Sequence, residues 1–190
     1  MSTGTVPSDE DCVRILTEAG CTKRVIVHCC TVRAVAEEIA GRIPCDTDLV
    51  VAGAILHDLG RAKDHSIMHA IIGADMAREL GLPEEIVAII RKHTGAGLDD
   101  QDADEMGIPR GDYIPATIEE KIVAHADNMV SNNRLVPHTH SVEKLMDKGA
   151  VRGANRIEEL HVELSKIYGE DLDVLVGVLG EYPRLKCVTR

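Results

Sequence analysis

Residues 49–60 read LVVAGAILHDLG, and this stretch decides the fold class. Residues 49–56 are apolar almost all round, which predicts a buried helix surrounded by other helices. The helix is expected to end at His57-Asp58-Leu59-Gly60, because glycine commonly follows the last turn of a helix. His57 and Asp58 are adjacent and would diverge on a regular helix. They can face one site only where the helix is ending.

Helix signals continue on both sides of this stretch. Start signals stand at Ser8, Thr22 and Thr117, and Thr117 has the spacing of a capping box with Glu120. No stretch alternates with period two for long enough to predict a strand. We therefore predict an all-α fold. The expected helices cover about 8–20, 22–41, 49–56, 66–80, 83–93, 117–130, 141–148, 151–168 and 171–181.

The composition limits the class of protein and of partner. The chain has 190 residues with 44% hydrophobic content and a formal net charge of −11, which describes one soluble domain or at most two small ones. No apolar run approaches the roughly 18 residues of a membrane span, so we expect a cytoplasmic protein without membrane contact. The acidic charge and the lack of Phe and Trp argue against polymeric nucleic acid as a partner.

Six cysteines are spread along the chain without a CxxC motif. This pattern fits reduced, buried thiols better than a disulfide framework or a zinc ribbon. The six are Cys12, Cys21, Cys29, Cys30, Cys45 and Cys187.

The histidines are distributed unevenly, and this suggests a metal site. Five of the nine fall between residues 28 and 93, on or beside predicted helix ends: His28, His57, His65, His69 and His93. Each histidine taken alone is more often a structural or surface residue than a ligand. Together with one or two aspartates, they fit iron, manganese, nickel or zinc better than calcium, and magnesium alone less well.

The order His28, His57-Asp58, Asp127 resembles the H…HD…D pattern of the HD-domain metal-dependent phosphohydrolases. The resemblance covers about residues 23–134, and the chain looks most like an archaeal branch of small stand-alone HD hydrolases. Three further segments support it: HAIIGA with His69, RKHTGAG with His93, and KIVAHADNMV with Asp127. The resemblance implies an HD-domain helical bundle with additional C-terminal helices. Residues 1–22 would be a tail and short helix, 23–134 the metal-binding core, and 135–190 C-terminal helices packed on that core, as a single domain overall.

The resemblance also implies roles for individual residues. His28, His57, Asp58 and Asp127 would bind one metal ion, with Asp58 bridging to a second ion held by His69 and His93. Asp58, Arg61 and His65 are the candidate catalytic residues, and His65 can be a ligand, a donor to a ligand or a general acid. Arg61, Lys63 and Arg134 are candidates for binding the substrate phosphate. His125 is expected to point elsewhere, because it lies two positions from Asp127 on the same predicted helix.

The implied function is hydrolysis of a phosphomonoester or phosphodiester by water activated by one or two divalent transition metal ions. The substrate would be a small phosphorylated molecule such as a nucleotide or a cyclic phosphate, with a pterin 2′,3′-cyclic phosphate as an alternative. A non-catalytic metal or nucleotide sensor and a helical oligomeric scaffold are the competing functions, and a homodimer is one possible assembly. The acid-rich segment 94–116 is interpreted as a solvated flap, with a lid over the pocket as the alternative.

Overall fold

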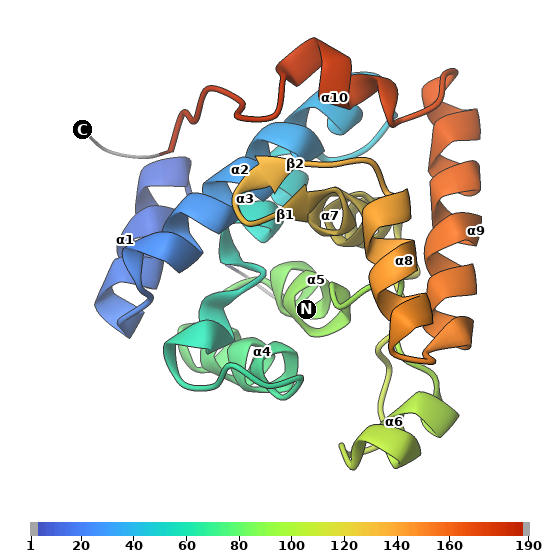
Figure 1. The fold of residues 1–190 in the computed structure, drawn as a ribbon. Coiled ribbons are helices and arrows are strands. Elements are labelled where there is room, and N and C mark those ends of the chain that lie inside the picture. Colours follow the sequence, from blue (N-terminus) through green and yellow to red (C-terminus); the bar gives the residue numbers. More distant parts are fainter. Residues whose placement is uncertain (1–3, 188–190) are drawn as a thin grey trace.

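The computed structural model describes residues 4–187, and over this range the chain forms ten α-helices, a short 3₁₀ helix and a small two-stranded hairpin (Figure 1). The all-α prediction is confirmed. Expectations for residues 1–3 and 188–190 lie outside the described residues. The elements are α1 (Asp9–Ala19), α2 (Lys23–Ala40), α3 (Thr47–Leu56), η1 (Leu59–Ala62), α4 (His69–Glu79), α5 (Glu84–Lys92), α6 (Asp100–Met106), α7 (Ile118–Asn128), β1 (Val130–Ser131), β2 (Arg134–Leu135), α8 (Thr139–Asp147), α9 (Val151–Tyr168) and α10 (Val174–Leu179).

Helix α3 lies at the centre of the bundle. It packs against α1, α2, α5 and α7, and every residue from Leu49 to Leu56 is buried. The side chain of Asp46 starts this helix by accepting a hydrogen bond from the backbone N–H of Leu49 at 3.0 Å. Residues 49–56 are apolar all round, so the polar groups of α3 lie at its two ends, and His57 and Asp58 follow its C-terminal end.

Two glycines allow α4 to approach the turn after α3. A Cβ atom on Gly60 would overlap the carbonyl oxygen of His69, and a Cβ on Gly73 would lie 2.8 Å from the backbone nitrogen of Gly60. Neither position has room for a side chain. This close backbone contact brings the first residue of α4, His69, beside the turn that carries Asp58.

The prediction of no strand is wrong for residues 130–135. Val130 pairs with Leu135 and Ser131 with Arg134 in an antiparallel hairpin. Asn132 and Asn133 form the turn with φ of 50° and 59°, values that Asn adopts more readily than most residues. Strands of two residues are too short to show an alternating pattern in the sequence.

Segment 94–116, interpreted as a solvated flap, is exposed over most of α6 but is not a loose loop. Its acidic residues form α6, which starts with a capping box between Asp99 and Asp102. Arg152 and Arg156 of α9 donate hydrogen bonds to Asp102, which is 7% exposed. These contacts hold α6 against the C-terminal helix α9. The composition of segment 94–116 alone does not reveal them.

One cysteine pair differs from the predicted set of reduced thiols. Cys30 of α2 and Cys187 are joined by a disulfide, with 5.8 Å between their Cα atoms. The two are 157 residues apart in sequence, so no local spacing indicates the pairing. Within residues 4–187 the other four cysteines are free, as predicted.

The C-terminal helices pack on the core through an apolar stripe. Helices α8 and α9 lie side by side and α9 contacts α7 (Figure 1), with Leu160, Leu164 and Leu175 buried. In the described part of the chain, no helix is both long and apolar enough to cross a membrane.

Candidate metal centre

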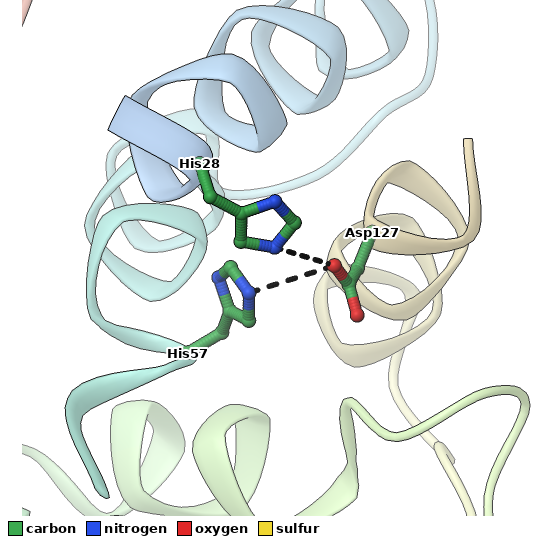
Figure 2. A group of neighbouring side chains, drawn as sticks. All are labelled: His28, His57 and Asp127. Atoms are coloured by element: carbon green, nitrogen blue, oxygen red, sulfur yellow. Dashed lines mark hydrogen bonds and ion pairs between the residues drawn. The ribbon is translucent and has the colours of Figure 1, made fainter. Parts of the chain in front are cut away.

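The six predicted metal ligands come from separate elements and meet at one place. His28 lies on α2, His57 and Asp58 follow α3, His69 begins α4, His93 follows α5, and Asp127 lies near the end of α7. His57 and Asp58 do face one site, because α3 ends at Leu56 and η1 begins at Leu59. Figure 2 shows His28 and His57 pointing at the Asp127 carboxylate from two different elements.

The first half of the centre consists of His28, His57, Asp127 and one oxygen of Asp58. The Nε2 atoms of His28 and His57 lie 3.0 and 3.6 Å from Oδ1 of Asp127, and 3.9 and 3.8 Å from Oδ2 of Asp58. Two ligands of one ion can be at most about 4.2 Å apart when each bond is about 2.1 Å long. All four separations meet that limit.

The other oxygen of Asp58 faces the second half of the centre. Oδ1 of Asp58 lies 3.2 Å from Nε2 of His69 and 3.7 Å from Nε2 of His93. The two Nε2 atoms are 3.1 Å apart. The carboxylate of Asp58 therefore lies between two groups of nitrogen atoms and presents one oxygen to each.

The tautomers of three imidazoles follow from their backbone contacts. Nδ1 of His57, of His69 and of His93 lies 2.7, 2.6 and 2.7 Å from a backbone carbonyl oxygen three residues earlier. Because a carbonyl only accepts, Nδ1 carries the proton and donates it, and Nε2 of a neutral ring keeps its lone pair. The three acceptors belong to Ala54, Ser66 and Ile90.

These tautomers leave lone pairs that a metal cation can satisfy. The Nε2 atoms of His69 and His93 face each other as two acceptors, and Nε2 of His57 is buried without a hydrogen-bond partner among the described residues. An unpaired buried polar atom costs about 1–3 kcal/mol. A set of imidazole nitrogens and carboxylate oxygens with this arrangement fits divalent transition metal ions.

The electrostatics favour ionised carboxylates and a neutral His93, whereas Asp127 raises the pKa of His28 against the effect of burial. Burial, together with the neighbouring His57 and His69, lowers the pKa of His93 to about 3. Burial alone would raise the pKa of Asp58, but the nearby histidines and Arg61 hold it well below its usual range. Burial also opposes ionisation of Asp127, yet the hydrogen bond from His28 and the other imidazoles lower its pKa to about 2. The carboxylates are ionised while His93 is neutral.

A cavity of about 360 Å³ opens beside the first half of the centre, and all three predicted catalytic residues, Asp58, Arg61 and His65, line it. Nε of Arg61 donates to Oδ1 of Asp58 at 3.0 Å, and Nη1 donates to the carbonyl oxygen of His65 at 2.9 Å. The His65 side chain lines the cavity but lies outside the group of six ligands. Arg61 therefore reaches both the carboxylate at the centre and the wall of the cavity.

The structure places two of the predicted phosphate-binding residues away from this cavity. Lys63 lines a different hollow, between α1 and α4, because η1 turns it away from Arg61. Arg134 is exposed on β2 and lies 3.9 Å from Glu181. Neither residue is among those that line the cavity at the centre.

Sequence reasoning missed three polar residues that line the same cavity: Arg24, Asn132 and Asn133. Nη2 of Arg24 donates to Oδ1 of Asn132 at 3.3 Å. Arg24 is four residues before His28, so a helical spacing places it on the same face of α2, and this signal was available. The position of the Asn132-Asn133 turn depends on a hairpin that was not predicted.

Comparison with known proteins shows the family of the chain. The family model of the HD domain matches residues 25–131. The chain belongs to the HD-domain family. All six candidate ligands of the HD domain lie within the matched range, whereas α8, α9 and α10 lie beyond it.

Two relatives in the family are archaeal-type proteins. A tRNA (cytidine(56)-2′-O)-methyltransferase of Picrophilus torridus is 45% identical over 168 residues, which cover 88% of this chain and 49% of the relative. An uncharacterized protein of Methanocaldococcus jannaschii is 41% identical over 129 residues, covering 65% of this chain and 76% of the relative. The chain thus spans about half the length of the methyltransferases that it matches.

A solved HD domain has the same fold. The HD domain of the L. monocytogenes phosphodiesterase PgpH, in complex with cyclic-di-AMP, matches with a TM-score of 0.53 and 16% identity. The match covers 92% of this chain and 99% of that domain. It therefore includes the C-terminal helices, and at this identity it supports the fold alone.

Proposed function

We propose that this HD domain hydrolyses a small phosphomonoester or phosphodiester with one or two divalent transition metal ions. The observation that carries the proposal is the position of Asp58, whose two oxygens face His28 and His57 on one side and His69 and His93 on the other. Iron, manganese, nickel and zinc all accept this set of ligands.

The six ligands would hold the ions in two groups that share Asp58. When bound, such ions lower the pKa of a water molecule and stabilise negative charge on phosphate oxygens. The backbone hydrogen bonds from Nδ1 of His57, His69 and His93 hold the rings in place, so little reorganisation is needed on binding.

Two arginines would bind the phosphate group of the substrate. Arg61 and Arg24 line the cavity of about 360 Å³ next to His28 and Asp58. A guanidinium can donate two parallel hydrogen bonds to phosphate oxygens. The contacts of Arg61 with Asp58 and with the His65 carbonyl would orient it toward a phosphate bound at the centre.

In this proposal, His65 would donate a proton to the leaving group. Its side chain lines the cavity without belonging to the ligand group, so its imidazole remains available for general acid catalysis. A His65→Gln variant should therefore lower kcat for poor leaving groups more than for nitrophenolate, which needs no proton.

The substrate class follows from size and charge. The cavity suits a nucleotide or a cyclic phosphate, and the net charge of −11 disfavours a long polyanion. The relatives named as tRNA methyltransferases are covered only over half their length, so methyl transfer is not carried over to this chain. The solved complex of PgpH makes cyclic-di-AMP a reasonable member of a substrate panel.

The test is to measure metal content by plasma mass spectrometry after anaerobic purification, and hydrolysis on the same sample. The panel contains bis-p-nitrophenyl phosphate, 2′,3′-cyclic nucleotides and cyclic-di-AMP. We expect hydrolysis that is lost on chelation and in Asp58→Ala, while His140→Gln, a change outside the centre, keeps it. Absence of both metal and turnover after reconstitution would overturn the proposal and favour a sensor.

A further inference from the structure

A second group of histidines lies where α7, α8 and α9 meet. It consists of His125 on α7, His138 immediately before α8, and His161 on α9. The rings of His138 and His161 are stacked with centroids 3.5 Å apart, and the centroid of His125 lies 5.2 Å from that of His161. His125 thus points away from the metal centre, as its spacing from Asp127 predicts.

Three carboxylates surround the stacked pair. Oδ2 of Asp173 lies 3.0 Å from Nδ1 of His138, and Oε2 of Glu158 lies 3.2 Å from Nε2 of the same ring. Oδ1 of Asp171 lies 3.2 Å from Nε2 of His161. His138 and His161 are only 7% and 5% exposed. If His138 is doubly protonated to donate to both of its partners, the group still has more negative than positive charge.

The geometry points to a second metal site, in which His138, His161 and Asp173 bind a divalent transition metal ion such as zinc. One nitrogen of each ring and one oxygen of Asp173 lie within 4.8 Å of one another. Two imidazoles and a carboxylate form a common ligand set for zinc. The site lies outside the matched range 25–131 and shares no residue with the centre around Asp58.

The surroundings prepare these side chains to bind an ion. Oδ1 of Asp173 accepts a hydrogen bond from the backbone N–H of His138 at 2.9 Å, which holds the carboxylate against the ring. Nδ1 of His161 lies 3.2 Å from Nε2 of His125, so one of these two nitrogens donates a hydrogen bond to the other. Such a contact orients a ligand ring, and Nε2 of His161, which faces Asp171, would bind the ion without its proton.

Two further observations describe the surroundings of the site. His125 is fully buried beside His161, and its Nδ1 has no hydrogen-bond partner within residues 4–187. A cavity of about 430 Å³, lined by His161, Ser165 and Asp171, connects the group with solvent and offers an ion a route of entry.

An ion at this site would hold the C-terminal helices against the HD core. Its ligands come from the segment before α8, from α9 and from the residue that precedes α10, and His161 in turn contacts α7 through His125. An ion bound by three such segments stabilises their arrangement, because the unfolded chain does not hold the ligands together.

Asp173→Asn is the sharpest test. Asn keeps an oxygen for the His138 N–H and replaces Oδ2, the candidate ligand atom, by an amide nitrogen. We expect the 190-residue chain loaded with Zn²⁺ to lose one ion per chain in Asp173→Asn, whereas Asp58→Ala loses metal from the centre around Asp58. His140→Gln is the control, because His140 lies on α8 only two residues after His138 but contacts Ser131 instead.

Thermal unfolding and Co²⁺ spectra provide independent readouts. Added Zn²⁺ should raise Tm less in Asp173→Asn than in the native chain or His140→Gln, and the Co²⁺ absorption bands of the site should be absent. His161→Gln should lose the same ion, with circular dichroism to verify folding. Equal Zn²⁺ content and equal Co²⁺ spectra in the native chain and folded Asp173→Asn would overturn the proposal, whatever the result for the centre at Asp58.

Discussion

The Nε2 atoms of His69 and His93 lie 3.1 Å apart, while Nδ1 of each ring donates to the backbone of its own segment. When both rings are neutral, neither nitrogen of the facing pair has a proton to offer the other, and a metal ion beside them would stabilise the pair. Oδ1 of Asp58 is 3.2 Å from His69 and completes a three-atom group. This relationship is the strongest indication that the second half of the centre binds an ion.

Replacing His69 should therefore remove one ion and leave the other. In His69→Ala, His28, His57 and Asp127 keep their contacts, so we expect metal content to fall by one ion per chain. Turnover should fall roughly 100-fold, since about 3 kcal/mol of charge stabilisation is lost. Plasma mass spectrometry and phosphodiester hydrolysis measure both quantities. Unchanged metal content would contradict the assignment of His69 as a ligand.

Arg61 and Lys63 provide a direct comparison of two cations close in sequence. Arg61 lines the cavity at the centre and contacts Asp58, whereas Lys63 lines a hollow between α1 and α4. We expect Arg61→Met to lower kcat/KM by about 10- to 100-fold, which corresponds to one lost charge-assisted hydrogen bond. Lys63→Met should change it less than twofold. Similar losses in the two variants, measured by steady-state kinetics, would refute this division.

The contact between Gly60 and Gly73 predicts a local loss of stability on adding a methyl group. In Gly73→Ala the new Cβ would lie 2.8 Å from the Gly60 nitrogen and 3.0 Å from Cγ2 of Ile90. We expect the free energy of unfolding to fall by about 1–3 kcal/mol. Gly177→Ala on α10 is the control, because its Cβ would meet no atom within 4 Å among the described residues. Urea unfolding measures the free energy of unfolding of both variants. Equal values for Gly73→Ala and Gly177→Ala would count against the close contact between Gly60 and Gly73.

Asp102 makes the docking of α6 dependent on pH. Burial alone would raise the pKa of Asp102, but the backbone hydrogen bond at Asp99 and the contacts of Arg152 and Arg156 lower it. A lowered carboxyl pKa contributes stability above the ordinary value near 3.9, and this contribution is lost as pH falls through the folded-state pKa. Asp102→Asn should destabilise the protein by about 1–3 kcal/mol at pH 7. The difference from the native chain should shrink in urea titrations below about pH 4, and a constant difference would argue against ionic docking.

The parts of the fold that could be predicted depend on local signals. Helix α9 was expected at residues 151–168 and spans Val151–Tyr168, and the capping box of Thr117 and Glu120 is present. In both cases the information lies within a few turns of one helix. The order of the histidines and aspartates around Asp58 was equally local, because each ligand stands at or near a helix end.

The parts that could not be predicted depend on partners far along the chain. The partners of α6 are Arg152 and Arg156, about 50 residues later, so its acidic sequence alone looked like a solvated loop. The disulfide joins residues 157 positions apart. His138 and Asp173 meet only because α8, α9 and α10 fold back on the core, and no spacing rule connects them.

The disulfide between Cys30 and Cys187 also restrains the helix that carries His28. Cys30 follows His28 by two positions on α2, which places the two side chains roughly 200° apart around the helix axis. One side of α2 is thus covalently joined to Cys187 in the C-terminal segment. On the opposite side, His28 contacts Asp127. Rotation of α2 about its own axis would also have to move Cys187. The disulfide therefore resists the rotation that would separate His28 from Asp127.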